Sequence, residues 1–175
     1  MTNYIVISAM GTDKPGIVEK LSGLAKENDC NLLDSKMSQM GSEFVLMMML
    51  SGENQSIENF SDQLPALADK LELTTHIKKT NKLQEPVTHK LYQVSVSALD
   101  HPGIVHRVTR FFSEHQVNVA TLNTQVTHAP HTGAPVFELN MDLQVNVNND
   151  FEQTRVDFEE FCEKYDLDGE LKAAG

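Results

Sequence analysis

One segment of the sequence occurs twice. The stretch GTDKPGIV at residues 11–18 returns as ALDHPGIV at residues 98–105, so that Asp13 recurs as Asp100, 87 positions later. The correspondence reaches beyond the segment, because Asn31 recurs at the same offset as Asn118. Solenoid repeats have periods of roughly 20 to 50 residues, so a longer period indicates that each copy is a small domain.

The apolar periodicity of each copy predicts strand, helix, strand, strand, helix, strand. In the first copy we expect strands at Asn3–Met10, Asn31–Met40, Glu43–Leu50 and Leu73–Lys79, and helices at Pro15–Glu27 and Ile57–Leu71. In the second we expect strands at Leu91–Ala98, Asn118–Thr127, Val136–Val147 and Gly169–Ala173, and helices at Pro102–His115 and Phe151–Tyr165. Pro65 falls inside a helix, where proline causes a kink or a break. The order predicts an α+β chain of two ferredoxin-like βαββαβ domains.

The segment NKLQEPVTHK separates the copies. It is polar, contains Pro86 and interrupts the apolar periodicity of both neighbours. We therefore expect domains at residues 1–80 and 90–175, with a linker at residues 81–89.

The third strand differs between the copies. In the second copy, apolar residues alternate with polar ones, as in a sheet with one face in water. In the first copy, the run FVLMMML is apolar on both faces, and helices can cover only one of them. We expect a second sheet or subunit to cover the other face and the chain to form a homo-oligomer. The alternative is a sheet whose apolar residues stay partly exposed.

The repeated turn leads from a strand into a helix. Proline is favoured at the first helical position, so Lys14 and His101 are the expected N-caps. The following backbone amides, Gly16 and Ile17 in the first copy, would then lack intrahelical partners and face a ligand. Glycine leaves room for close approach and the helix dipole favours an anion, so a carboxylate fits there.

Nearby polar residues complete a pattern suited to a free α-amino acid. Asp13 or Asp100 can accept hydrogen bonds from an ammonium group, and Asn31 or Asn118 offers both a donor and an acceptor. A purely structural turn with a capping carboxylate explains the turn motif equally well, so both interpretations stay open.

Composition excludes several classes of partner. The chain has 14 Lys and Arg against 25 Asp and Glu, and its net charge of -11 opposes direct binding to nucleic acid. No apolar run could cross a membrane, and the N-terminus lacks a basic region followed by a cleavage site, so we expect a cytoplasmic protein. Cys30 and Cys162 are expected to be reduced thiols.

The sequence shows no pattern typical of an enzyme. It has no nucleophile with an adjacent base and no nucleotide-binding loop, and His128 and His131 share a loop without further metal ligands. We therefore expect no catalytic residue, no metal site and no cofactor.

These features together resemble ACT domains, which sense amino acids in metabolic enzymes and regulators. In each copy a D-x-P-G-I-V turn follows the first strand and an asparagine follows the first helix, and the resemblance covers Asn3 to Ala173. Carried over position by position, it implies ligand contacts at Gly11, Asp13, Pro15, Gly16, Ile17 and Asn31, and at Ala98, Asp100, Pro102, Gly103, Ile104 and Asn118. The second copy departs from the first in the insertion HAPHTGAP and in its short last strand.

More narrowly, the segments GTDKPGIV, CNLLDSKMSQMGSEF and MMMLSG are similar to the family of glycine cleavage system transcriptional repressors. That resemblance implies repression through a transcriptional activator protein rather than through DNA, with release by glycine. A different role also stays open, that of a detached regulatory subunit controlling an amino-acid-metabolising enzyme.

Overall fold

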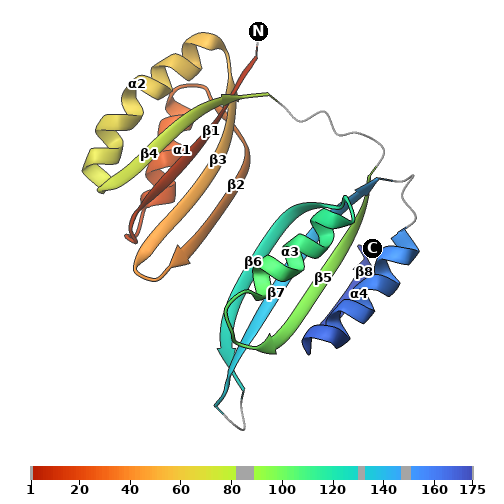
Figure 1. Cartoon of the computed structure of the whole chain (residues 1–175). Helices are drawn as coiled ribbons and strands as arrows, with labels where there is room; N and C mark the ends of the chain where they lie inside the picture. The colour runs from red at the N-terminus through yellow and green to blue at the C-terminus, as the bar shows by residue number, and fades with distance from the viewer. Residues whose placement is uncertain (1, 82–88, 130–132, 147–150, 175) are drawn as a thin grey trace. The chain divides into compact units, whose positions relative to one another are not determined.

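The computed structural model describes residues 2–81, 89–129, 133–146 and 151–174. The chain divides into two compact units, residues 1–84 and 85–175 (Figure 1). Most of the expected linker, residues 82–88, lies outside the described residues, so its extent remains a prediction.

Both units have the βαββαβ order expected from the sequence. The first unit contains β1 (Asn3–Thr12), α1 (Ile17–Glu27), β2 (Asn31–Met40), β3 (Glu43–Gly52), α2 (Asn54–Leu71) and β4 (Leu73–Thr80). The second contains β5 (His89–Leu99), α3 (Ile104–Glu114), β6 (Asn118–His128), β7 (Pro135–Asn146), α4 (Phe151–Tyr165) and β8 (Asp168–Ala173). The α+β prediction of two tandem domains is confirmed.

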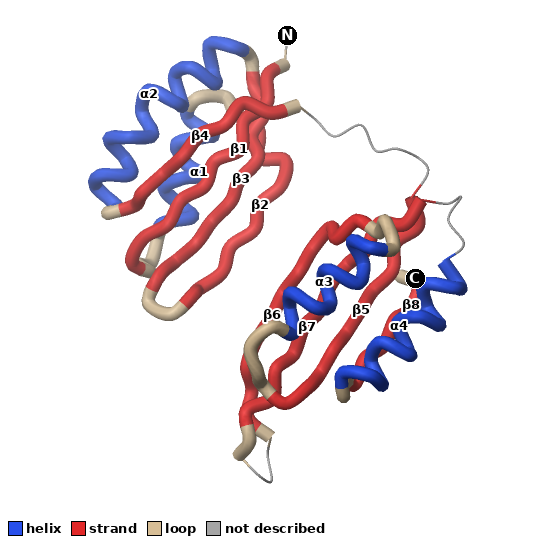
Figure 2. Tube along the Cα trace, viewed as in Figure 1, coloured by secondary structure: helices blue, strands red, loops and turns tan. Residues whose placement is uncertain are grey.

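Each unit is a four-stranded antiparallel sheet with two helices on one face (Figure 2). The strand order is β2-β3-β1-β4 in the first sheet and β6-β7-β5-β8 in the second. The two edge strands carry the same irregularity, since the register shifts between Leu32 and Asp34 in β2 and between Val119 and Thr121 in β6. The duplication therefore extends to details of strand pairing.

A separate apolar core lies between sheet and helices in each unit. In the first unit, Leu21 of α1 and Phe60 of α2 pack against Ile5 and Leu50 of the central strands, and all four are almost fully buried. Burial of a side chain of this size contributes about 1.5–3 kcal/mol. Apolar residues at the corresponding positions of α3 and α4 complete the core of the second unit, where the rings of Phe112 and Phe158 are in contact.

Pro65 does not split α2, which runs as one helix of 18 residues. Leu64 and Ala68, on either side of the proline, are buried in the core. Their packing holds the helix together across the missing amide hydrogen, because tertiary contacts stabilise helices more than propensity does.

The predicted starts of α1 and α3 are wrong by two residues, because both helices begin after the glycine of the turn. Gly16 and Gly103 have φ of 90° and 97°, a left-handed conformation that glycine adopts without steric cost. Glycine, and not Lys14 or His101, is therefore the N-cap residue in each domain.

Candidate functional site

The turn between β1 and α1 exposes the start of a helix. The carbonyl oxygen of Gly16 accepts the first intrahelical hydrogen bond, from the amide of Lys20 at 3.0 Å. Among the residues that the structure describes, no side chain caps this terminus. The amides of Gly16, Ile17 and the next two residues are thus oriented as donors for an external acceptor.

The second domain reproduces this geometry. The carbonyl oxygen of Gly103 accepts a hydrogen bond from the amide of Arg107 at 3.0 Å, and no side chain in the described ranges caps α3. Ile104 is buried beneath the turn, as is Ile17 in the first domain. Both isoleucines therefore anchor the turns to the cores, and any contact of theirs with a ligand must come from the backbone.

The two helix starts differ in charge. The first turn of α1 contains Glu19, whereas α3 has His106 at the corresponding position and no acidic residue in its first turn. A carboxylate near a helix N-terminus interacts with the same positive end of the dipole that would attract an anion. The α3 terminus is therefore the less compensated of the two.

Asp13 and Asp100 precede the turns and are exposed. Their backbone amides tie the turns to the neighbouring hairpins, Asp13 to the Ser42 carbonyl at 3.5 Å and Asp100 to the Pro135 carbonyl at 3.1 Å. Within the described part of the chain, neither carboxylate forms a hydrogen bond or an ion pair. Both are available to a cationic group.

Lys14 and His101 occupy matching positions but make different contacts. The Lys14 ammonium pairs with Glu72 at 2.8 Å, and Nδ1 of His101 lies 3.2 Å from the Pro102 carbonyl. The Lys14 pair is largely solvated and contributes little to stability.

The predicted asparagines lie away from the turns of their own domains. Asn31 is opposite Ser51, which is opposite Tyr4 at the start of β1, whereas the turn follows the other end of that strand. The seven residue steps from Tyr4 to Gly11 span about 23 Å at ~3.3 Å per step. Asn118 occupies the equivalent place and donates to Gln144 at 3.2 Å. Neither asparagine can join the turn of its own domain around one amino acid.

Gly11 has a packing role that explains its residue type. A Cβ atom there would collide with the Glu72 carbonyl and crowd Leu73. Ala98 takes the corresponding position in the second domain, where a methyl group is accommodated. These two positions shape the strand that leads into each turn. Pro15 and Pro102 lie exposed within the turns.

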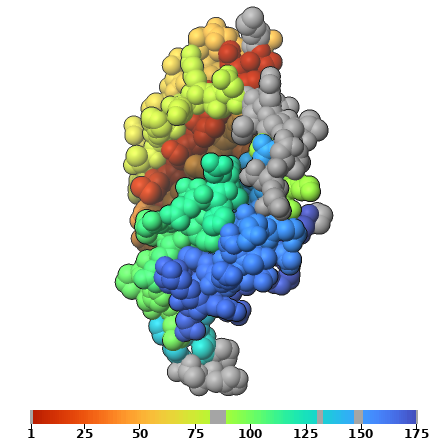
Figure 3. Space-filling view, turned by 45° about the vertical axis from the view of Figure 1, so that its right-hand side comes forward, coloured from red at the N-terminus to blue at the C-terminus, as the bar shows by residue number. Residues whose placement is uncertain are grey.

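Sequence reasoning did not identify a groove between α3 and α4. It has a volume of about 470 Å³ and is lined by residues from both helices, among them Arg107, Phe111, Lys164 and Tyr165 (Figure 3, where green α3 borders blue α4). The Arg107 guanidinium lies 5.1 Å from the centre of the Tyr165 ring. The corresponding face of α1 and α2 is also hollowed, with Gly23 at the position of Arg110, so a comparison of the two copies gives no sequence signal for this groove.

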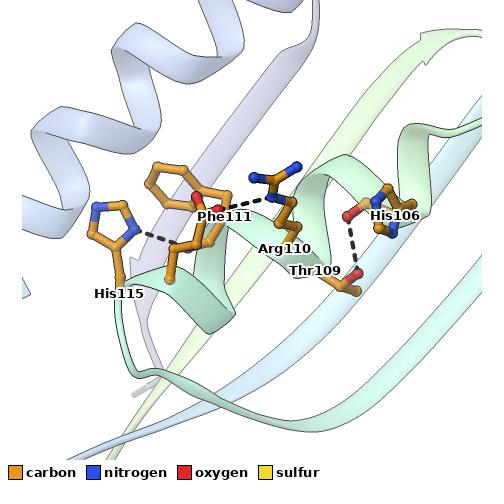
Figure 4. A network of polar contacts seen from close by, with 6 residues as sticks. His106, Thr109, Arg110, Phe111 and His115 are labelled. Atoms are coloured by element: carbon orange, nitrogen blue, oxygen red, sulfur yellow. Dashed lines mark hydrogen bonds and ion pairs between the residues drawn. The ribbon is translucent and has the colours of Figure 1, made fainter.

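Polar contacts stiffen the α3 side of this groove (Figure 4). Arg110 pairs with Glu114 at 2.8 Å, and Nδ1 of His115 lies 2.8 Å from the Phe111 carbonyl. Nε2 of His115 lies 3.1 Å from a carboxylate oxygen of Asp157, which links α3 to α4.

Hydrogen bonds change the acidity of one group beside the groove. Gln153 and His115 both donate hydrogen bonds to the Asp157 carboxylate. These bonds lower the pKa of Asp157, and the bond from Gln153 has the larger effect. Both cysteines are buried. Desolvation raises the pKa of Cys162 to about 11, so its thiol stays protonated at neutral pH.

Nowhere in the described ranges do three or more His, Cys, Asp or Glu side chains gather closely enough to hold a metal ion. Among the described residues, no helix combines the length and apolar character needed to span a bilayer.

The chain is similar to known proteins in both sequence and structure. Residues 3–78 and residues 92–147 each match the ACT domain family. The glycine cleavage system transcriptional repressor of Escherichia coli K12 is 27% identical over 169 residues, which cover 97% of this chain and 89% of the repressor. The crystal structure of a provisionally assigned glycine cleavage system transcriptional repressor superposes with a TM-score of 0.77 at 28% identity, covering 99% of this chain and 98% of the other. A protein from Galdieria sulphuraria shares the fold along its full length, with a TM-score of 0.79 at 21% identity.

Proposed function

Because this chain belongs to the ACT domain family, we propose that it is a cytoplasmic amino-acid sensor that represses the glycine cleavage operon by binding the operon's activator protein. Glycine relieves the repression by binding the repressor and weakening its complex with the activator. Similarity to the Escherichia coli repressor over 97% of the chain supports this assignment.

The observation that carries the ligand proposal is the pair of uncapped helix starts with matching backbone geometry. An amino-acid carboxylate accepts hydrogen bonds from the free amides at Gly103 and Ile104 and gains from the helix dipole. The ammonium group pairs with Asp100, whose carboxylate has no partner among the described residues. A small side chain fits because a glycine, without Cβ, borders the site.

The α3 turn is the stronger of the two sites. Glu19 already compensates the positive end of α1, whereas His106 leaves that of α3 open. Sequence resemblance alone favoured the first copy, which lacks the insertion between the two hairpin strands. The absence of an acidic residue from the first turn of α3 instead favours the site in the second copy.

An asparagine can reach a bound amino acid only at the turn of another domain, since Asn31 lies at the opposite end of its own sheet. The effect of Asn31→Ala on glycine affinity therefore shows whether one domain or two domains form the binding site. Unchanged glycine affinity means that each turn binds alone, and a weakened affinity means that a second domain completes the site.

Direct contact with DNA is not part of the proposal. The net charge of -11 opposes the electrostatic attraction that supplies much of the affinity for a duplex. The helices of the described residues all belong to the two βαββαβ units.

The test measures the affinity of the purified activator for this protein by fluorescence anisotropy, with and without saturating glycine. Glycine should weaken the complex by a factor in the usual allosteric range of roughly 5 to 150, and by reciprocity the activator should weaken glycine binding equally. Asp100→Asn should strongly reduce the glycine response and leave activator binding intact, whereas Asp62→Asn, a charge-matched change on α2, should alter neither.

Two results would contradict the proposal: activator affinity that is the same with and without glycine, or a gel shift of the operator by this protein alone at physiological salt. Absence of activator binding together with specific capture of an amino-acid-metabolising enzyme would instead support a detached regulatory subunit.

A further inference from the structure

The helix-free faces of the two sheets have opposite character. In the first domain, the centre of this face consists of Val6 and Met10 from β1 and Val45, Met47 and Met49 from β3. We call these five residues the apolar stripe. Met10 is 52% exposed and Met47 is 50% exposed, although both are large apolar side chains.

The second domain provides an internal comparison. Gln93, Ser97, Glu138, Asn140 and Asp142 occupy the positions that match the apolar stripe. Several of these polar side chains bind one another or their neighbours, as in the 3.4 Å hydrogen bond from Gln93 to Asp142. The second face is therefore suited to water, while the first exposes a contiguous apolar surface that a soluble protein normally covers.

We infer that the apolar stripe is a dimer interface, covered by the apolar stripe of a second copy of this chain. The polar and acidic face of the second domain is not complementary to the apolar stripe, because it would place carboxylates against methionines. A second copy instead places apolar residues against apolar residues.

The strand register shows that the face is complementary to itself. Asp34 of β2, Met49, Val6 and Lys78 of β4 form one row across the sheet. Two sheets stacked about a two-fold axis parallel to the strands place β2 of one copy over β4 of the other. Each Asp34 then faces the Lys78 of the other copy, and neither side chain has an ion-pair partner among the described residues of its own chain.

The neighbouring rows fit the same arrangement. Met47 of one copy lies over the small side chain of Ser8 of the other, and Val45 lies over Met10. Lys36 faces His76 at the rim, where both side chains are exposed to solvent.

The size of the face sets the expected strength. Four strands ~4.8 Å apart and seven residues along each strand give a footprint of roughly 400 Å² per copy. The total buried area, about 800 Å², is below the roughly 1,200–2,000 Å² of stable specific interfaces and is in the range of weak, transient complexes. The dimer should therefore dissociate in the micromolar range, and its measurement needs a wide range of protein concentration.

Sedimentation velocity of the full chain, from about 1 to about 200 µM, tests the inference without glycine or activator and is independent of the proposed function. The wild type should shift from monomer to dimer. Met47→Glu should remain monomeric throughout, and Asn140→Glu, the same change in charge at the matching position of the second domain, should dimerise like the wild type.

A charge exchange tests the two-fold arrangement. Asp34→Lys should weaken the dimer at least tenfold, and the double variant Asp34→Lys, Lys78→Asp should restore it. Thermal melting checks that each variant folds, and these exposed positions allow the exchange even where Met47→Glu does not fold. A wild type that stays monomeric, a Met47→Glu variant that dimerises normally, or a double variant as weak as the single one would overturn the inference.

Discussion

Replacing His106 by glutamate should weaken glycine binding while stabilising the second domain. Position 106 is the third residue of α3, and its side chain is exposed. The substitution gives α3 the acidic residue that α1 already has as Glu19. The opposite signs of the two effects distinguish loss of a binding site from simple structural damage.

Two charge terms set the magnitudes. A carboxylate in the first turn of a helix contributes about 0.3–1 kcal/mol, which raises the Tm of a small domain by a few degrees. Repulsion between that carboxylate and a ligand carboxylate about 4 Å away is about 1 kcal/mol where bulk water screens the two charges, which corresponds to about a fivefold loss of affinity. Both effects should shrink as salt is added, because the site is exposed.

Isothermal titration calorimetry with glycine and thermal denaturation measure the two effects on the same sample. His106→Gln serves as the control, because it removes the imidazole without adding charge and should leave affinity and Tm near those of the wild type. Glu19→Gln should act in the opposite direction at the first turn, improving its affinity. If His106→Glu raises the Tm but leaves glycine affinity unchanged, glycine does not bind at the α3 terminus.

Gly16→Ala should destabilise the first domain by about 1 kcal/mol because φ is positive there, whereas Gly23→Ala in the middle of α1 should stabilise it by a similar amount; equal melting temperatures would contradict this. Because the pKa of Asp157 is lowered in the folded state, its contribution to stability is present above about pH 4 and is lost as the pH falls below that value. Asp157→Asn should therefore flatten the acid limb of the unfolding curve, and an unchanged limb would contradict it. Cys162 should react with a thiol reagent at pH 8 only as fast as the second domain opens, and reaction at the rate of the denatured chain would show that its burial is wrong.

The fold was predictable because local patterns and the repeat agreed. Apolar spacing located all the helices and strands described in the structure, and the offset of 87 residues supported each assignment with a second copy. The starts of α1 and α3 were predicted wrongly because the sequence of the turn is compatible with two local structures. Proline could begin the helix, but Gly16 and Gly103 adopt a left-handed conformation and delay it by two residues.

The site was less predictable because it depends on where chain segments return in space. Asn31 follows α1 closely in sequence, yet the helix runs back along the sheet and delivers it to the far end from the turn. The βαββαβ order already implies this separation, because β2 starts where β1 starts. The groove between α3 and α4 was not predicted for a related reason. Its lining residues come from two helices that are far apart in the sequence.

The most direct test of the account is a glycine titration of isotope-labelled protein followed by amide NMR signals. Binding through the helix start should shift the amide signals of Gly103 and Ile104 most strongly, with smaller changes at Gly16 and Ile17 because Glu19 weakens that site. Asp100→Asn should remove the shifts in the second domain. Saturating glycine that leaves all four amide signals in place would contradict the claim that these turns sense an amino acid.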